Sequence, residues 1–372
     1  MKTILILSYT DLKKDPRPYR QISFLKSKGF RVVTVGLSKS SLEDEFFQIR
    51  KINPFFRLFR LILLLFKFYH LFYWDKYKKQ ILKILYKDFD VVIAHEVRLL
   101  PLAFELANGK PVILDAHEYS PLNFDDSLIW RLFIKDYYKY LCDTFIPKVS
   151  CILTVSDGIV NMYIDNYKVP TYLIVNLPSF EDLKPTKNLQ KIRLIHHGIV
   201  SSSRKLELMI DAMEFLDENL YELNLILVRN DFTVNYYHKL INRAKRFRNI
   251  NFLEPVPREE LIEFCNQFDL GIIFCPPTNF NIKHGLPNKF FEFVQSRLGI
   301  IIGPDIEMSK YVLKYELGVR AKDWSPLGLA SAIKLLERDE IFRFKSNSDK
   351  VAHILSSEEQ NYVFLNIINQ FL

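Results

Sequence analysis

The sequence predicts an α/β protein built from two doubly wound, Rossmann-like domains that face each other across a cleft. Its 372 residues exceed what one ordinary core holds, because domains average about 150 residues. Hydrophobic residues make up 49% of the chain and charged residues 25%, which is typical of a globular protein. In both halves short apolar runs alternate with helix-like stretches, and this alternation indicates parallel sheets with right-handed crossovers.

The predicted strands follow the apolar runs. In the first half, with a helix near 17–28 after the first strand, they are 4–7, 31–35, 91–94, 112–115 and 151–155. In the second half they are 193–196, 223–228, 250–253, 270–274 and 300–302. The segment 178–191 contains prolines and charged residues without an apolar period, so we interpret it as a linker. The domains are then 1–177 and 192–350, and 351–372 forms a C-terminal helix that packs back on the first domain.

Composition and missing motifs argue against several classes of function. The four cysteines form no Cys-x-x-Cys pair, which argues against a zinc site or a disulfide framework and favours a reducing cytosol. The chain holds only 11 glycines, and neither a dinucleotide fingerprint nor a Walker A loop follows any predicted strand. The formal charge of +8 suits nucleic acid, anionic lipid or phosphorylated substrates and does not choose among them.

The segment 54–83 has an amphipathic, cationic pattern. At helical spacing its basic residues gather in one arc and Leu, Ile and Phe fill the rest, but the apolar run is too short to span a bilayer. We expect either a helix that lies on an anionic membrane surface or a core-packed helix whose basic side chains reach solvent. The basic residues of the arc are Arg57, Arg60, Lys67 and His70.

The most informative stretch is 283–303. Gly285 and Pro287, at a first helical position, precede an apolar helix face, so this helix N-terminus presents unpaired N–H groups that favour an anion. One turn later the carboxylate of Glu292 is placed to accept hydrogen bonds from a ribose diol. A phosphate and a sugar would therefore be held together here. The alternative is an ordinary loop and helix with a surface glutamate.

Many short motifs, in this order, resemble the retaining, nucleotide-sugar-dependent glycosyltransferases of family 4, which have the GT-B fold. The resemblance spans nearly the full chain. The matching pieces are Asp15-Pro16-Arg17 with Arg20, Lys28-Gly29-Phe30, Asp115-Ala116-His117-Glu118, Thr154-Val155-Ser156-Asp157, Val175-Asn176, His197-Gly198, Arg204-Lys205, Asn251-Phe252, Val256-Pro257, Glu259-Glu260-Leu261 and Leu286-Pro287-Asn288-Lys289-Phe290-Phe291-Glu292.

The resemblance implies a donor site in the second domain. The family carries a pair of glutamates; Glu292 matches the one that binds ribose, and His284 stands where the one that contacts the transferred sugar is expected. The cations Arg204 and Lys205 would hold the diphosphate and stabilise the leaving group, without a metal. The expected donor-binding set is completed by Gly198, Val256, Gly285, Leu286, Asn288 and Lys289.

The resemblance also implies roles at the sheet edge of the first domain. His117 would contact the transferred sugar as a catalytic residue. The residues expected to face the cleft and the acceptor are Asp15, Arg17, Arg20 and Glu118. On sequence alone, a histidine near a strand end is more often structural, and the charges after the first strand also fit a solvated helix N-terminus.

We expect a cytoplasmic enzyme that needs no cofactor, either free or peripheral on the inner face of the plasma membrane. It would transfer a sugar from a nucleoside diphosphate sugar to a lipid-linked or growing polysaccharide acceptor, with no nucleic-acid partner. Two alternatives stay open: a non-catalytic, membrane-docked subunit of a polysaccharide assembly complex, and a phosphorylase or epimerase on the same fold.

Overall fold

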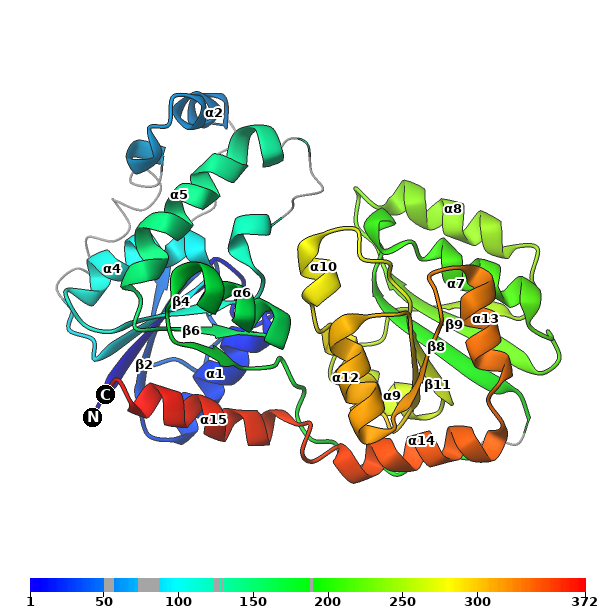
Figure 1. Ribbon diagram of the computed structural model, residues 1–372. Helices are drawn as coiled ribbons and strands as arrows, with labels where there is room; N and C mark the ends of the chain where they lie inside the picture. Colours follow the sequence, from blue (N-terminus) through cyan, green and yellow to red (C-terminus); the bar gives the residue numbers. More distant parts are fainter. Residues whose placement is uncertain (50–56, 73–86, 124–127, 129, 188–189) are drawn as a thin grey trace. The chain divides into compact units, whose positions relative to one another are not determined.

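A computed structural model describes residues 1–49, 57–72, 87–123, 128, 130–187 and 190–372. The chain divides into two compact units (Figure 1). Unit 1 consists of 1–175, 279–281 and 361–372, and unit 2 consists of 176–278 and 282–360. Each unit is described separately below.

Unit 1 is built on a parallel sheet, seven-stranded within the described residues, with the strand order β3-β2-β1-β4-β5-β6-β7. Its central strands are buried, apart from the first residue of β1, because helices cover both faces of a doubly wound sheet. The strands are β1 (Thr3–Leu7), β2 (Arg31–Gly36), β3 (Glu45–Gln48), β4 (Val91–His95), β5 (Val112–Ala116), β6 (Cys151–Thr154) and β7 (Thr171–Leu173).

Unit 2 repeats this plan with a parallel sheet, six-stranded within the described part of the chain, in the order β10-β9-β8-β11-β12-β13. The expected pair of parallel, doubly wound sheets is thereby confirmed. The strands are β8 (Ile192–Ile199), β9 (Tyr221–Val228), β10 (Ile250–Leu253), β11 (Leu270–Ile273), β12 (Gly299–Ile302) and β13 (Gly318–Arg320).

The helices before β13 connect successive strands, and those after it follow the last strand of the sheet (Figure 1). Those of unit 1 are α1 (Pro16–Ser27), α2 (Arg57–Leu65), α4 (Leu100–Ala107), α5 (Lys135–Phe145) and α6 (Asp157–Tyr167). Those of unit 2 are α7 (Glu207–Ala212), α8 (Val234–Ala244), α9 (Leu261–Asn266), α11 (Asn288–Gln295), α12 (Ile306–Tyr315), α13 (Pro326–Lys334) and α14 (Arg338–Val351). The remaining two, α10 (Phe280–His284) and α15 (Ser357–Asn369), include residues of both units.

Local sequence explains where the helices next to the site begin. The Asp15 side chain caps α1 by accepting the backbone N–H of Arg17, and Pro16 opens the helix. In α11, Pro287 is the N-cap with extended backbone angles and the helix begins at Asn288, one residue later than the sequence suggested. The end of α15 contributes Phe364, Ile367 and Ile368 to the apolar core under β1 and β4.

Within the described residues, no helix is long and apolar enough to cross a membrane. Of the cationic segment 54–83, α2 and the residues up to 72 are described, whereas 54–56 and 73–83 lie outside the described residues. Five apolar side chains in the described part are exposed to solvent: Ile62, Leu65, Phe66, Phe68 and Leu71.

Candidate functional site

Each sheet reverses its strand order at one point, and ligands of open α/β sheets bind beside the carboxyl ends of strands at such points. In unit 1 the reversal lies between β1 and β4, and in unit 2 it lies between β8 and β11. The side chains that follow these strands are therefore the first candidates for a functional site.

In unit 2, the end of β8 meets the first turn of α11 at a buried lysine. Lys289 is 8% exposed, and its Nζ lies 3.3 Å from Nε2 of His196 on β8. The Nδ1 atom of His196 lies 2.8 Å from the carbonyl oxygen of Ile272, which can only accept, so Nδ1 carries the proton and Nε2 is left as an acceptor. Burial, followed by the charge of Lys289, holds the pKa of His196 well below its ordinary value. The imidazole therefore accepts a hydrogen bond from Lys289 but supplies no negative charge.

Within the described residues, His196 is the one hydrogen-bond partner of the Lys289 ammonium group, and no carboxylate lies within ion-pair distance of it. Burial lowers the pKa of Lys289 to about 8; the charge of Arg204 adds to this effect, whereas Cys275 and Glu292 act in the opposite direction. A buried ammonium group without an anion costs several kcal/mol in desolvation. The position of Lys289 therefore favours binding of an anionic ligand.

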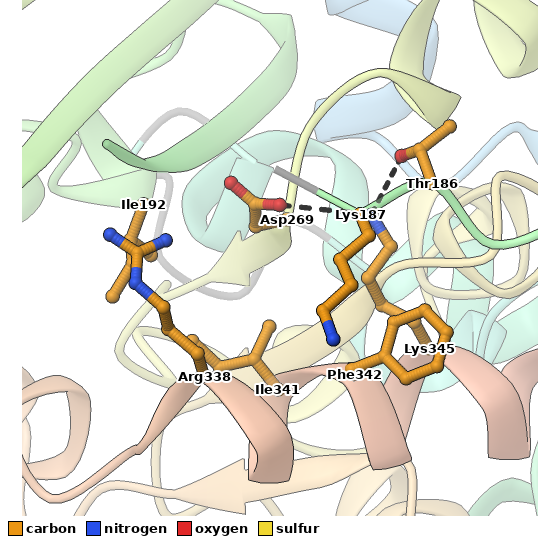
Figure 2. A pocket seen from close by; sticks show the side chains of 8 residues that line it. All are labelled: Thr186, Lys187, Ile192, Asp269, Arg338, Ile341, Phe342 and Lys345. Carbon is orange, nitrogen blue, oxygen red and sulfur yellow. Dashed lines mark hydrogen bonds and ion pairs between the residues drawn. The ribbon is translucent and has the colours of Figure 1, made fainter. Parts of the chain in front are cut away.

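A second buried lysine of unit 2 provides a contrast (Figure 2). Lys345 donates hydrogen bonds to Thr186 Oγ1 at 3.0 Å and to the Phe268 carbonyl oxygen at 2.5 Å, and its Nζ lies 3.8 Å from Asp269 Oδ1. The adjoining cavity measures about 20 Å³, room for one or two waters. Lys345 is thus satisfied by the protein itself, and we interpret this pocket as structural.

Gly198 lies beside the Lys289 ammonium group and the Arg204 guanidinium. Its φ is 141°, and a Cβ built at this position would lie 2.9 Å from Lys289 Nζ and 3.4 Å from Arg204 Nη1. Arg204 ends the 3₁₀ turn Ser202–Arg204 and donates a hydrogen bond from Nη1 to the Ile199 carbonyl oxygen at 3.1 Å. The next residue, Lys205, has left-handed backbone angles and an exposed side chain. The two cations that meet at Gly198 are therefore Arg204 and Lys289.

Glu292 lies one turn further along α11. Its side chain is 15% exposed, and Oε2 lies 3.6 Å from Nε2 of His197 on β8. Burial, and then the charge of Lys289, lowers the pKa of His197 to about 3, so this imidazole is neutral at pH 7. The Glu292 carboxylate therefore lies beside a neutral imidazole rather than a cation.

The other residues expected at the donor site are distributed along the same loops. His284 ends α10, and its Nδ1 lies 3.5 Å from Oε1 of the buried Glu307 on α12. Asn288 accepts a hydrogen bond from Asn176 Nδ2 at 2.6 Å. Between α10 and α11, Gly285 is partly exposed and Leu286 is buried. Val256 is partly buried in the loop after β10.

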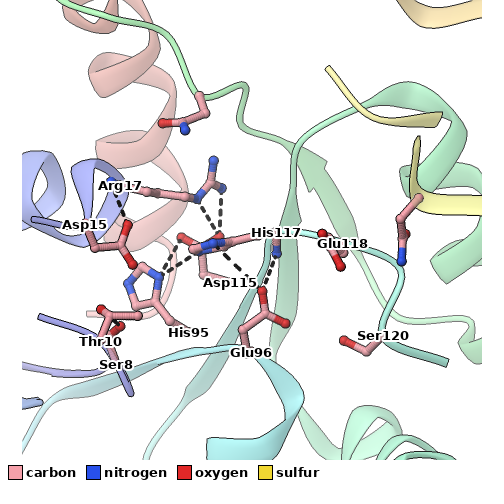
Figure 3. Close-up of polar contacts among 12 residues, drawn as sticks. Ser8, Thr10, Asp15, Arg17, His95, Glu96, Asp115, His117, Glu118 and Ser120 are labelled. Carbon is pink, nitrogen blue, oxygen red and sulfur yellow. Dashed lines mark hydrogen bonds and ion pairs between the residues drawn. The ribbon is translucent and has the colours of Figure 1, made fainter. Parts of the chain in front are cut away.

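In unit 1, a cavity of about 250 Å³ lies at the carboxyl ends of β1, β4 and β5. Figure 3 shows the polar side chains that meet there. His95 on β4 and His117 after β5 form a hydrogen bond of 3.0 Å between Nδ1 and Nε2, and His117 Nδ1 lies 3.8 Å from Glu96 Oε1. Burial lowers the pKa of both imidazoles, that of His117 to about 3, so the pair is neutral at pH 7.

The residues expected to face an acceptor occupy different positions around this cavity. Asp15 and Glu118 line it, and Arg20 is partly buried on α1. Arg17 is 4% exposed and is held by protein groups: Nη2 lies 2.7 Å from Asp115 Oδ1, and Nη1 donates to the Ile174 carbonyl oxygen at 2.7 Å. Arg17 therefore ties α1 to β5 and to the residue that follows β7.

His95, Asp115 and His117 lie close enough together to ligate a metal ion. Both carboxylate oxygens of Asp115 already accept hydrogen bonds, Oδ1 from Arg17 Nε at 2.8 Å and Oδ2 from Gln21 Nε2 at 2.5 Å. A divalent cation here would face the Arg17 guanidinium across one carboxylate, and this repulsion favours the metal-free arrangement.

Sequence reasoning did not single out His95, Glu96, His196 or Glu307. The first three follow or end a predicted strand at a point where the strand order reverses, so strand ends were an available signal for them. Nothing in the sequence pairs Glu307 with His284, because that contact depends on how α12 packs.

No protein-family model and no curated protein matches this chain. Similar solved structures include sucrose-phosphate synthase from Thermosynechococcus elongatus, with a TM-score of 0.74 and 13% identity over 100% of this chain and 99% of that chain. HepE from Anabaena, in complex with UDP and glucose, has a TM-score of 0.70 and 12% identity over 100% of both chains.

A third similar structure is WaaG, a glycosyltransferase involved in lipopolysaccharide biosynthesis. It has a TM-score of 0.65 and 12% identity, and the match covers 96% of this chain and 99% of that chain. At these identities the likeness shows the fold. The chain therefore has the GT-B fold of two Rossmann-like domains, which it shares with glycosyltransferases.

Proposed function

We propose that unit 2 binds a nucleoside diphosphate sugar and that the protein is a retaining glycosyltransferase of family 4 type. The observation that carries this proposal is the pair of cations, Lys289 and Arg204, that meets beside the bare main chain of Gly198. Lys289 is buried, and within the described residues no carboxylate lies within ion-pair distance of its ammonium group. A diphosphate supplies the missing negative charge and accepts hydrogen bonds from both side chains.

The remaining polar groups of unit 2 suit the other parts of such a donor. The Glu292 carboxylate is placed one turn after Asn288, the first residue of α11, and can accept two hydrogen bonds from ribose hydroxyls. The start of α11 adds a favourable dipole for the diphosphate. HepE was solved in complex with UDP and glucose, and a similar trehalose-6-phosphate structure from E. coli was solved with UDP-2-fluoro glucose, which supports trying uridine donors first.

In the proposed reaction, fixed cations stabilise the charge that develops on the leaving nucleoside diphosphate. Lys289 and Arg204, each held by a hydrogen bond before the donor arrives, would supply this stabilisation without a metal. We propose Lys289, rather than the exposed Lys205, as the second diphosphate cation beside Arg204. The resemblance assigns His117 to the transferred sugar, and a neutral imidazole suits a hydrogen bond with a hydroxyl.

We propose a lipid-linked or growing polysaccharide acceptor, in cell-surface glycan biosynthesis. The exposed apolar side chains of the α2 segment, with Lys67 beside them, suit a protein that meets its substrate at an anionic membrane surface. WaaG, which is involved in lipopolysaccharide biosynthesis, supports the same class of acceptor.

The test is release of the nucleoside diphosphate from a panel of UDP, GDP and ADP sugars, with membrane lipid extract as the acceptor source. We expect turnover of one donor by the wild-type protein and at least a tenfold loss in kcat/KM for Glu292→Gln. The exposed Glu254→Gln serves as the matched charge control. Release of a sugar phosphate when inorganic phosphate is added would favour a phosphorylase. Absence of turnover together with absence of nucleotide binding would overturn the proposal.

A further inference from the structure

Glu96, directly after β4, has a backbone conformation that residues with a side chain rarely adopt. Its φ is 73° and its ψ is 145°, a region that is populated almost entirely by glycine. Hydrogen bonds hold the main chain in this conformation, because Glu96 N donates to the Asp115 carbonyl oxygen at 3.0 Å and Leu99 N donates to the Glu96 carbonyl oxygen at 3.1 Å. Glycine would fit here without strain, so a glutamate in this place points to a use for its side chain.

The strained backbone directs the Glu96 carboxyl group into the unit 1 cavity, beside His117 (Figure 3). Oε1 accepts a hydrogen bond from the His117 backbone N–H at 3.2 Å and lies 3.8 Å from His117 Nδ1. Burial, and then the charge of Glu118, raises the pKa of Glu96 to about 8, while Arg98 and the His117 N–H act in the opposite direction. Near neutral pH this carboxyl group can both donate and accept a hydrogen bond.

The lining of the cavity indicates the class of ligand. Besides Glu96 and Glu118 it includes the hydroxyl groups of Ser8 and Thr10 and the amide of Asn123. Asp15 and the cation Arg98 line it as well, so the lining combines hydrogen-bond donors and acceptors, which suits a ligand rich in hydroxyl groups. At about 250 Å³ the cavity is far larger than the roughly 10–15 Å³ that one water needs.

We propose that this cavity binds a hydroxyl-rich ligand and that Glu96 directs one ligand hydroxyl toward the imidazole of His117. The proposal rests on the proposed function in that the ligand would be the sugar that accepts the transferred group. Glu96 would then contribute mainly to the KM of the acceptor, because it positions the acceptor sugar and does not itself take part in the transfer.

The experiment compares Glu96→Gly and Glu96→Gln with wild type, and uses the exposed Glu359→Gln in unit 2 as the charge control. Glycine removes both the carboxyl group and the backbone strain. We expect Glu96→Gly to melt at the wild-type temperature or above and to raise the KM for p-nitrophenyl glycoside acceptors at least tenfold. Glu96→Gln keeps an acceptor for the His117 N–H and should show a smaller rise in KM. The Kd for nucleotides, which bind to unit 2, should not change in either variant.

Direct calorimetric binding of p-nitrophenyl glycosides to the same variants separates this proposal from the proposed function. Wild-type binding that is lost in Glu96→Gly supports the role of Glu96 even if no nucleotide binds to the protein. A Glu96→Gly variant that melts lower and keeps the wild-type KM and glycoside affinity would show that Glu96 is structural and would overturn the proposal. Failure of every glycoside to bind or accept would overturn the ligand class.

Discussion

The Lys289 ammonium group lies against the main chain of Gly198, where a Cβ would lie only 2.9 Å from Lys289 Nζ and 3.4 Å from Arg204 Nη1. Gly198→Ala would therefore displace both cations and strain a backbone with φ of 141°. We expect at least a tenfold loss of nucleotide affinity and a loss of about 1–3 kcal/mol in the free energy of unfolding. Gly29→Ala is the control, because Gly29 has φ of 82° and open space around its Cβ position. It should lose stability but keep nucleotide affinity; equal nucleotide affinity in both variants would argue against the site.

The pKa of Lys289 predicts a proton linkage. Burial lowers this pKa to about 8, so near pH 8 a substantial fraction of the free protein carries a neutral amine. A bound diphosphate favours the ammonium form, so binding should take up a proton near pH 8, and affinity should fall as the pH rises through 8. Calorimetric titration in Tris and in HEPES, which differ in ionisation enthalpy, measures this uptake. The same uptake in Lys289→Met would assign it to another group.

The buried ion pair between Arg17 and Asp115 predicts a stability effect rather than a binding effect. Arg17→Met leaves a buried carboxylate without its cation, and we expect a loss of about 3–5 kcal/mol in the free energy of unfolding, measured with urea. Adding Asp115→Asn should recover part of this loss. Wild-type stability in Arg17→Met together with weaker acceptor binding would instead favour the cleft role that the sequence suggested.

The same pair sets a dependence of stability on pH. Burial alone would raise the pKa of Asp115, but the charge and the hydrogen bond of Arg17 contribute to an opposing effect that outweighs burial and lowers it. A depressed carboxyl pKa stabilises the folded state at pH values above about 3.9, the value in the unfolded chain, and this contribution is lost as the pH falls further. The loss on acidification below pH 4 should therefore be smaller in the Arg17→Met, Asp115→Asn double variant.

The exposed apolar side chains of the α2 segment predict membrane binding. Leu65 is 59% exposed and Phe66 is 69% exposed. Replacing both with serine should reduce cosedimentation with vesicles of phosphatidylcholine and phosphatidylglycerol, because buried apolar area contributes to interfacial binding. Leu335→Ser, at a 79% exposed position of unit 2, is the control. Unchanged cosedimentation in the double variant would assign membrane binding to another surface.

Most of the fold could be predicted because buried parallel strands appear as continuous apolar runs. The predicted strand 300–302 corresponds to β12 and 91–94 corresponds to β4. Sequence reasoning missed β3, β7 and β13, which lie at sheet edges. Most of their side chains are half-buried, so they lack the apolar pattern that identifies a central strand.

Less of the site could be predicted, because charges in a sequence do not show their partners. Arg17 was expected to face a ligand, and the structure gives it a buried carboxylate. Lys289 was expected at the donor site, but its burial and its approach to Gly198 depend on how α11 packs against β8. The backbone strain at Glu96 had no sequence signal, since glutamate has no preference for positive φ.

The most direct test of the donor site is calorimetric titration of the wild-type protein and Lys289→Met with UDP, GDP, ADP and their sugars. We predict saturable binding of one nucleotide series to the wild type. For Lys289→Met we predict a loss of about 10–100-fold in affinity, from one charge-assisted hydrogen bond, together with a higher melting temperature because a buried charge is removed. The exposed Lys334→Met controls for the loss of one charge. Failure of every nucleotide to bind, or wild-type affinity in Lys289→Met, would contradict the account.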